Sequence, residues 1–170
     1  KKARQEPDPR KRDLSPTRLD FGPVRLLLAR HFGFCYGVEN AIEIAYRTLL
    51  ESSGRRVFFL SEMIHNPKVN GDLLERGVRF LFTPAGEQLV PWEELDAADV
   101  VVVPAFGTTL ELQEKLSERG IDPYRYNTTC PFVEKVWKRS AQLGADRFTV
   151  IVHGKDTHEE VMRRLLAPIA

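Results

Sequence analysis

The stretch VVVVPAFGTTLELQEKLSERG, residues 100–120, decides the fold class. It opens with four consecutive valines, and such an unbroken apolar run predicts a strand covered on both faces of a parallel sheet. A short loop follows, and residues 109–119 then repeat apolar side chains at the spacing of an amphipathic helix. Gly120 comes next, and glycine is common where a helix ends in a left-handed residue. The stretch therefore predicts one strand–loop–helix unit.

The same unit recurs along the chain. The expected strands, each with the helix that follows it, are 25–30 with 38–51, 57–60 with 68–76, 100–103 with 109–119, 124–127 with 132–143, and 149–152 with 157–166. A further short strand is expected at 78–81 and a short helix at 92–95. Alternating strands and helices with right-handed crossovers predict an α/β fold built of parallel-sheet βα repeats.

Composition restricts the class of protein. The chain has 170 residues, of which 42% are hydrophobic and 29% are charged, so a folded core is expected. No apolar run approaches the roughly 20 residues of a membrane-spanning helix, and the charged start lacks the apolar region of a signal peptide. We therefore expect a soluble cytoplasmic chain with no membrane partner. Because it begins with Lys1 rather than Met, we also expect a trimmed piece.

Charge is distributed unevenly. Residues 1–20 hold seven Lys or Arg and four Asp or Glu, so they carry the excess of positive charge. Residues 1–23 are expected to form a flexible charged tail, with a binding arm as the alternative. The remaining chain is nearly neutral and shows no clustered basic groove, so nucleic acid is not an expected partner.

The residues that can carry chemistry follow the expected strands. They are the cysteines Cys35 and Cys130 and the histidines, among them His65, His153 and His158. In an open α/β sheet, ligands bind beyond the carboxyl ends of the strands, where helix N-termini also point. A thiol at a helix N-terminus is favoured as thiolate, which is the form that binds metals. The pattern predicts a site at this edge of the sheet.

Each of these residues also has a structural interpretation. The alternative for Cys35 is a small buried hydrophobe, and for His65 it is a loop histidine bonded to its own backbone. For His153 we favour a buried core histidine, and for Trp137 packing rather than a cofactor site. A disulfide is not the default without a secretory signal. A redox dithiol stays open if the two cysteine Cα atoms lie within about 7 Å.

Five longer blocks carry a resemblance to a known family. They are FGFCYGVENAIEIA, SEMIHNPKVNGDLLERGVRF, VVVPAFGTT, YNTTCPFVEKVWK and VHGKDTHEE, in that order. The blocks and their spacing resemble the LytB/IspH family, the 4-hydroxy-3-methylbut-2-enyl diphosphate reductases that end the methylerythritol phosphate route to isoprenoids. The resemblance covers residues 24–166, and several blocks together are far more specific than one short motif.

The resemblance implies an iron–sulfur enzyme. Family members hold a 4Fe–4S cluster with three cysteines, of which Cys35 and Cys130 match two, and the third lies beyond this chain. His65 matches a histidine that lines the pocket for the substrate diphosphate. His158 matches a histidine near the substrate hydroxyl, and Glu160 matches the carboxylate that helps to deliver protons. The implied reaction removes this hydroxyl reductively, with electrons from ferredoxin or flavodoxin, and yields isopentenyl and dimethylallyl diphosphate.

The resemblance also implies a domain arrangement. Family members resemble three α/β domains around the cluster, so residues 24–129 are expected to form the first domain and 130–170 the start of the second. Phe106 stands where many members have a second diphosphate histidine, although the plant- and cyanobacterium-like branch, which this chain resembles, also reads PAFG. The alternative function is that this chain alone is a non-catalytic α/β module that binds an anion or a partner.

Overall fold

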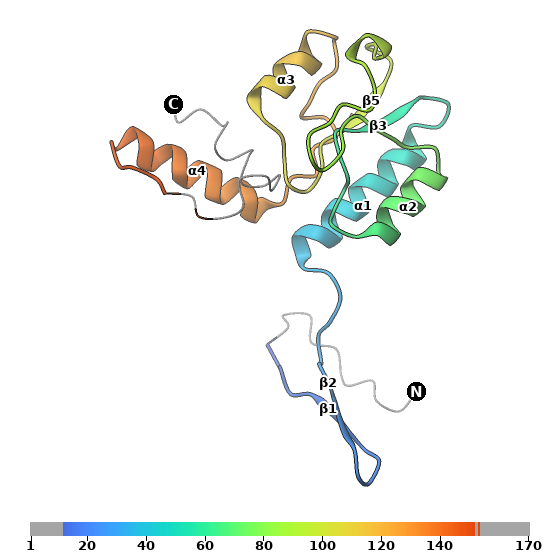
Figure 1. Ribbon diagram of the computed structural model, residues 1–170, viewed down its shortest axis with the longest axis vertical. Helices are drawn as coiled ribbons and strands as arrows, with labels where there is room; N and C mark the ends of the chain where they lie inside the picture. The colour runs from blue at the N-terminus through green and yellow to red at the C-terminus, as the bar shows by residue number, and fades with distance from the viewer. Residues whose placement is uncertain (1–11, 152, 154–170) are drawn as a thin grey trace. The chain divides into compact units, whose positions relative to one another are not determined.

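The computed structural model describes residues 12–151 and 153 (Figure 1). The chain divides into two compact units, Lys1–Cys35 and Tyr36–Ala170, and each is described by itself. Among the described residues, no helix has both the length and the apolar character needed to cross a membrane.

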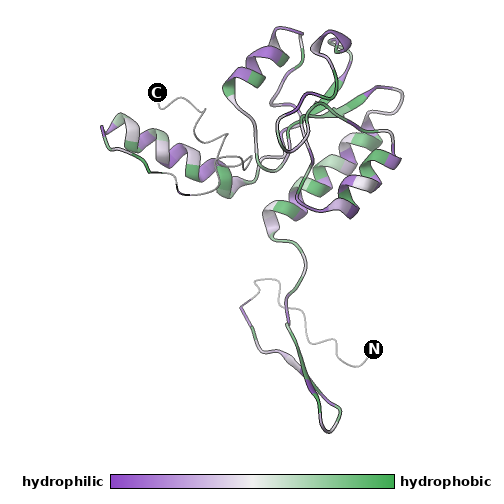
Figure 2. Ribbon diagram, in the orientation of Figure 1, coloured by the Kyte–Doolittle hydropathy of each residue, from purple (hydrophilic) through white to green (hydrophobic). Residues whose placement is uncertain are grey.

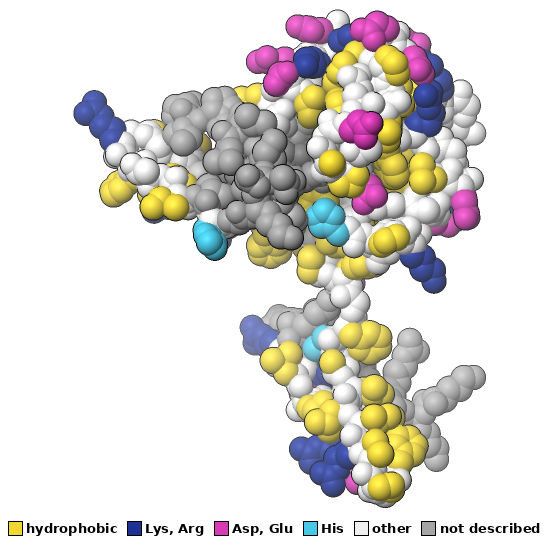
Figure 3. Space-filling view, viewed as in Figure 1, with side chains coloured by type: hydrophobic (Ala, Val, Ile, Leu, Met, Phe, Trp, Pro, Cys, Tyr) yellow, Lys and Arg dark blue, Asp and Glu magenta, His cyan; other side chains and the backbone are white. Residues whose placement is uncertain are grey.

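The smaller unit contains an antiparallel hairpin. Its strands are β1 (Thr17–Asp20) and β2 (Arg25–Leu28), paired so that Asp20 lies opposite Arg25. The turn uses Gly22, whose φ of +82° is left-handed, and the Asp20 carboxylate accepts a hydrogen bond from the Gly22 N–H (3.0 Å). Figure 3 shows hydrophobic side chains along this hairpin, and the leucines of β2 are 45% to 60% exposed.

The hairpin corrects two expectations from the sequence. Residues 25–30 are expected to enter the parallel sheet, but β2 pairs antiparallel with β1 instead. Residues 17–20 are expected within a flexible tail, but they form β1. The reason is the turn, because a glycine at positive φ beside an aspartate reverses the chain over a few residues. The adjacent segment is then the nearest partner for pairing.

The larger unit is built on a parallel sheet. Its three strands lie in the order β4 (Arg79–Phe80), β3 (Val57–Phe59) and β5 (Val100–Val102). Every residue of β3 and β5 is buried. This agrees with the unbroken apolar runs, which predict strands covered on both faces. The α/β class with parallel βα repeats is therefore confirmed.

Helices precede, connect and follow the strands of the larger unit (Figures 1 and 2). In the described part of the chain they are α1 (Tyr36–Glu51), α2 (Pro67–Glu75), the short 3-10 helix η1 (Trp92–Glu94), α3 (Leu110–Ser117) and α4 (Pro131–Ala145). The ends of each lie within two residues of the bounds expected from the sequence. Gly77 and Gly120 follow α2 and α3 with φ of +87° and +73°, as a left-handed helix end requires.

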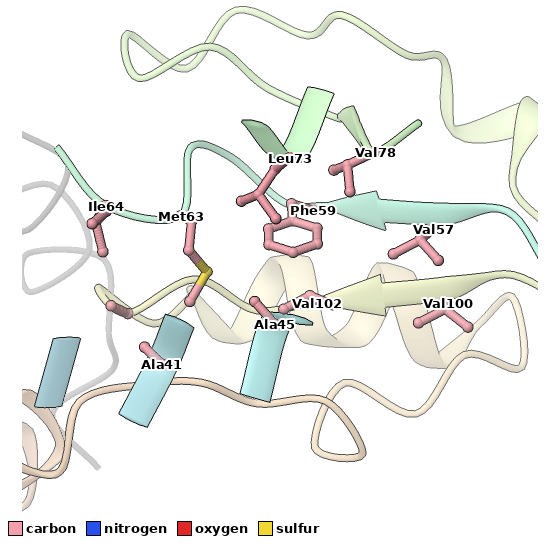
Figure 4. Packing of buried hydrophobic residues seen from close by; sticks show 11 residues of the cluster. Ala41, Ala45, Val57, Phe59, Met63, Ile64, Leu73, Val78, Val100 and Val102 are labelled. Carbon is pink, nitrogen blue, oxygen red and sulfur yellow. The ribbon is translucent and has the colours of Figure 1, made fainter. Parts of the chain in front are cut away.

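Two buried cores lie on the two faces of the parallel sheet. In β3, Val57 and Phe59 belong to one core and Phe58 to the other, because successive side chains of a strand point to opposite faces. The first core adds residues of α1 and α2, among them Leu73 (Figure 4). The second core adds Leu116 of α3. Helices α1 and α2 therefore cover one face of the sheet, and α3 covers the other.

The expected strand at 124–127 is reduced to a single parallel bridge between Asn127 and Val103. The Asp122 carboxylate accepts a hydrogen bond from the backbone N–H of Tyr124 (2.8 Å), which bends this segment into a turn. The turn leaves too few extended residues for a full strand, so the prediction is wrong here except at the bridge.

The expected strand at 149–152 is not formed by its described residues. Residues 149–151 lie outside any strand and follow Arg147, whose φ of +62° marks the turn after α4. Residue 152 and the expected helix at 157–166 lie outside the described residues.

Candidate functional site

The candidate site is built from loops at the carboxyl ends of the parallel strands. β3 leads into the loop that carries His65, and β5 leads into the loop that carries Phe106. A third segment runs beside the end of β5 and brings Cys130 to the start of α4. This edge of an α/β sheet is where ligands bind, because loops and helix N-termini meet there.

His65 lies on a loop whose backbone is held by two asparagines. The buried Asn70 accepts a hydrogen bond from the Met63 N–H (3.1 Å) and donates one to the Ile64 carbonyl (2.8 Å). Asn66 caps α2, since its Oδ1 accepts hydrogen bonds from two N–H groups of the first helical turn (3.0 and 3.2 Å). The backbone of His65 is therefore fixed on both sides, while the residue itself is exposed.

The imidazole of His65 stacks on the ring of Phe106. The ring centroids are 4.4 Å apart and the ring planes differ by 28°. The same two loops are also joined through their backbones, where the Ala105 N–H donates to the Met63 carbonyl (3.4 Å). Thr109 then caps α3, and its Oγ1 accepts a hydrogen bond from the third helical N–H (3.3 Å). His65 and Phe106 thus form one aromatic surface at the candidate site.

Cys130 reaches the same edge because its segment extends the parallel pairing. The Thr128 N–H donates to the Val103 carbonyl (3.0 Å), and the Cys130 N–H donates to the Ala105 carbonyl (2.9 Å). Cys130 is the N-cap residue of α4, with Pro131 at the first helical position. Its side chain makes no capping hydrogen bond, and its thiol is free and half-buried.

The first turn of α1 contacts the Cys130 thiol. A Cβ at Gly37 would lie 3.2 Å from the Cys130 Cβ and closer still to its Sγ, so glycine lets the thiol rest there without a shift. Gly37 is helical and has no positive φ, so close approach rather than backbone freedom explains this glycine. Cys35 precedes Gly37 by two residues and is the last residue of the smaller unit. Its thiol is free and exposed, which excludes the interpretation as a buried hydrophobe.

A second glycine, Gly107, lies against the Trp137 side chain of α4. A Cβ at Gly107 would lie 2.8 Å from Cζ2 of Trp137 and closer still to its Cη2. The predicted packing role of Trp137 is therefore confirmed. Two polar atoms here, Nε1 of Trp137 and Oγ1 of Thr108, are buried and have no hydrogen-bond partner among the described residues.

Helix N-termini set the electrostatics of this edge. Helices α2 and α3 begin after the two loops, α4 begins at Cys130, and the first turn of α1 lies against its thiol. The backbone N–H groups at a helix start carry partial positive charge, which favours anions and thiolates. The edge therefore suits a phosphate group or a thiolate ligand.

The remaining predicted site residues are not brought into this arrangement. His158 and Glu160 lie outside the described residues. His153 is described, and it is exposed rather than the buried core histidine that we expected. The reason is that the described residues before it form no strand and so give it no core to join. Within residues 12–151 and 153, no group of three or more His, Cys, Asp or Glu side chains could hold a metal ion.

Our sequence interpretation did not identify the roles of Gly37 and Gly107. Gly37 precedes the helix expected at 38–51, so the helical pattern held no signal for its packing role, which appears only because α1 begins at Tyr36. The sequence did not indicate which side chain contacts each glycine, since Cys130 at the N-cap of α4 and Trp137 within α4 lie far along the chain.

Comparison with known proteins identifies relatives of this chain. The family model described as LytB protein matches residues 26–164. The 4-hydroxy-3-methylbut-2-enyl diphosphate reductase of Synechococcus sp. (strain RCC307) is 42% identical over 141 residues, which are 83% of this chain and 34% of that protein. The reductase of the same name from Prochlorococcus marinus (strain MIT 9313) is 40% identical over 144 residues, 85% of this chain and 35% of that protein. The chain therefore spans about a third of the length of these curated relatives.

Solved structures share the fold. A structure of (E)-4-hydroxy-3-methyl-but-2-enyl diphosphate reductase, described as the terminal enzyme of the non-mevalonate pathway, matches with a TM-score of 0.62 and 32% identity. The match covers 78% of this chain and 43% of that one. The corresponding reductase of Plasmodium falciparum matches with a TM-score of 0.65 at 22% identity, over 78% of this chain and 38% of that one. At that identity the likeness shows the fold alone.

Proposed function

This chain belongs to the LytB protein family, and on this premise we propose that it is the N-terminal part of a 4-hydroxy-3-methylbut-2-enyl diphosphate reductase. The reaction is a reductive dehydroxylation, in which the C–O bond to the substrate hydroxyl breaks, a C–H bond forms and the hydroxyl leaves as water. Two electrons and two protons balance this step. Ferredoxin or flavodoxin donates the electrons, and the products are isopentenyl and dimethylallyl diphosphate.

The observation that carries the proposal is the position of the Cys130 thiol against the first turn of α1. Gly37 makes this contact, and Cys35 precedes Gly37 by two residues, a chain length of at most about 7 Å. This supports the proposal that both thiols are within reach of one metal cluster. Thiolates are the ligands that iron–sulfur clusters take, and both cysteines are free to act as ligands.

We assign Cys35 and Cys130 as two ligands of a 4Fe–4S cluster. By the family resemblance, the third cysteine ligand lies outside this chain, whose two cysteines are Cys35 and Cys130. When bound, the cluster supplies electrons and a Lewis-acidic iron for the departing hydroxyl.

The residues of this chain bind the substrate and move its protons. His65 donates a hydrogen bond to the diphosphate, and the stack on Phe106 holds the imidazole in one plane for this contact. The nearby helix N-termini stabilise the same negative charge. His158 contacts the substrate hydroxyl and Glu160 delivers protons; both assignments rest on the family resemblance, since these residues lie outside the described ones.

The proposal includes a domain arrangement and a location. Residues 24–129 form the first α/β domain, and residues 130–170 begin the second. Residues 1–23 are a charged N-terminal segment that contains β1. The enzyme works in the cytoplasm.

Substitution of the cysteines tests the proposal in the full-length reductase. After anaerobic reconstitution with iron and sulfide, Cys35→Ser and Cys130→Ser should each abolish consumption of the diphosphate substrate, because each removes a cluster ligand. Ser53→Ala is the control, since Ser53 is exposed and precedes β3 at the opposite end of the sheet. Unaffected turnover in either cysteine variant would contradict the assignment.

A second candidate function applies to this chain alone, as an α/β module that binds an anion or a partner without a cluster. It rests on the helix N-termini at the carboxyl ends of the parallel strands, which suit an anion without any metal. Iron and acid-labile sulfide analysis of the 170-residue chain separates the two. A stable, stoichiometric cluster contradicts the module.

A further inference from the structure

Gly37 and Cys130 are brought together from distant parts of the larger unit. Gly37 is the second residue of α1, and Cys130 is the N-cap of α4. The Sγ of Cys130 occupies the space in which any other residue at position 37 would place its Cβ. Gly37 is buried, so this space is part of the packed interior rather than of the surface.

Helix α4 makes a second contact of the same kind. Trp137 lies within α4, seven residues after the N-cap Cys130. The ring of Trp137 fills the space above Gly107, where a Cβ would come within 2.8 Å of Cζ2. The Cys130 thiol and the Trp137 ring therefore each lie against a glycine of another segment.

We propose that Gly37 is a positioning residue for the Cys130 thiol. Glycine at position 37 lets the sulfur rest against the first turn of α1. Alanine there displaces the sulfur by rotation of the Cys130 side chain, because the thiol is the flexible end of that side chain and moves most easily. The role of Cys130 as a cluster ligand rests on the proposed function, whereas the position of its sulfur does not.

Alkylation of Cys130 measures this position without any metal. The 170-residue chain is used with Cys35→Ser, so that Cys130 is its one thiol. The rate of reaction with iodoacetamide is compared between variants at one fixed alkaline pH, so that a difference in rate reports access to the sulfur. Adding Gly37→Ala should raise the rate at least about threefold, because the displaced sulfur leaves its half-buried position.

Gly71→Ala is the matched control. Gly71 is also a helical glycine, in α2, and a Cβ there would meet nothing within 4 Å. This variant should alkylate at the rate of its parent. The proposal is overturned if Gly37→Ala leaves the rate unchanged or lowered, or if Gly71→Ala raises it equally.

A double-mutant cycle keeps the proposal testable where Gly37→Ala lowers stability. Cys130→Ala removes the sulfur and so relieves the overlap with a Cβ at position 37. Gly37→Ala should therefore shift the urea midpoint less in the Cys130→Ala chain than in the chain that keeps Cys130. Equal shifts in the two backgrounds overturn the proposal.

The reconstituted full-length reductase gives the functional readout. Gly37→Ala should lower the iron retained per protein and alter the electron paramagnetic resonance spectrum of the reduced cluster, while Gly71→Ala changes neither. If Gly37→Ala alters neither the spectrum nor the iron content, Gly37 does not position Cys130 for the cluster. If the unsubstituted reductase binds no cluster, the proposed function fails, while the alkylation rates still decide the position of the thiol.

Discussion

Phe106 presents its ring to the imidazole of His65, with 4.4 Å between the ring centroids. A phenyl ring donates no hydrogen bond, so Phe106 cannot act as the second diphosphate histidine that many family members have at this position. The ring instead restricts the plane of the imidazole. Offset aromatic pairs contribute about 0.5–1.5 kcal/mol beyond their buried area. Under the proposed function, Phe106 therefore orders one histidine for phosphate binding.

Phe106→Leu in the full-length reductase tests this role. Leucine retains apolar volume but not the stacked ring, so the substrate KM should rise about threefold while kcat is unchanged, because binding in the ground and transition states is weakened equally. Steady-state kinetics measure both constants. Phe148→Leu is the control, at a phenylalanine that is 64% exposed. A fall in kcat at unchanged KM would assign Phe106 to the chemical step instead.

At the scale of elements, a polar cluster joins α1 to α2. Asp72 of α2 accepts hydrogen bonds from Arg76 Nε (2.7 Å) and from the hydroxyl of Tyr46 in α1. These bonds, that of Arg76 first, hold the pKa of the Asp72 carboxyl below its ordinary value. Burial, and then the bond to Asp72, raises the pKa of the Tyr46 hydroxyl. The contact between the helices thus depends on an ionised carboxylate.

The lowered pKa of Asp72 predicts acid sensitivity. A carboxyl whose pKa is lower in the folded than in the unfolded chain contributes stability that is fully present above the unfolded value, about 3.9. That contribution is lost as the pH falls through the folded value. Asp72→Asn should therefore lose less of its free energy of unfolding between pH 6 and pH 2 than the unsubstituted chain.

Urea denaturation at a series of pH values measures this difference. Glu75→Gln is the matched control, because Glu75 is exposed on the same helix. Its acid dependence should match that of the unsubstituted chain. An unchanged acid dependence in Asp72→Asn would rule out the Asp72 contacts as the source.

At the scale of the whole molecule, the hairpin contributes no residue to the described cores of the α/β unit. The two cores of the larger unit draw on described residues from Val38 onwards and include none from β1 or β2. We therefore expect that removing residues 1–20, and β1 with them, leaves the thermal midpoint of the α/β unit within about 2 °C.

Calorimetry of the truncated and complete chains checks this expectation. Phe59→Ala is the positive control, because Phe59 is fully buried in β3 and the cavity should lower the midpoint by more than about 10 °C. A decrease of that size on removing residues 1–20 would show that the hairpin supports the larger unit.

The helices could be predicted from the sequence because their signals are local. Asn66 and Thr109 cap α2 and α3 through hydrogen bonds to the next turn, and Gly77 and Gly120 end them at positive φ. The strands were less predictable, since a strand needs a partner. The apolar run 25–30 paired with its neighbour β1 instead of the parallel sheet.

The sequence by itself determined the α/β class, the family, and which residue types lie near the strand ends, because periodicity and motif spacing are properties of the chain alone. Only the tertiary structure decided that His65 stacks on Phe106 and that Gly37 receives the Cys130 thiol. The physical reason is that these contacts join segments far apart in the chain. The parallel pairing of β3 with β5, extended by the segment before Cys130, is what brings them to one edge of the sheet.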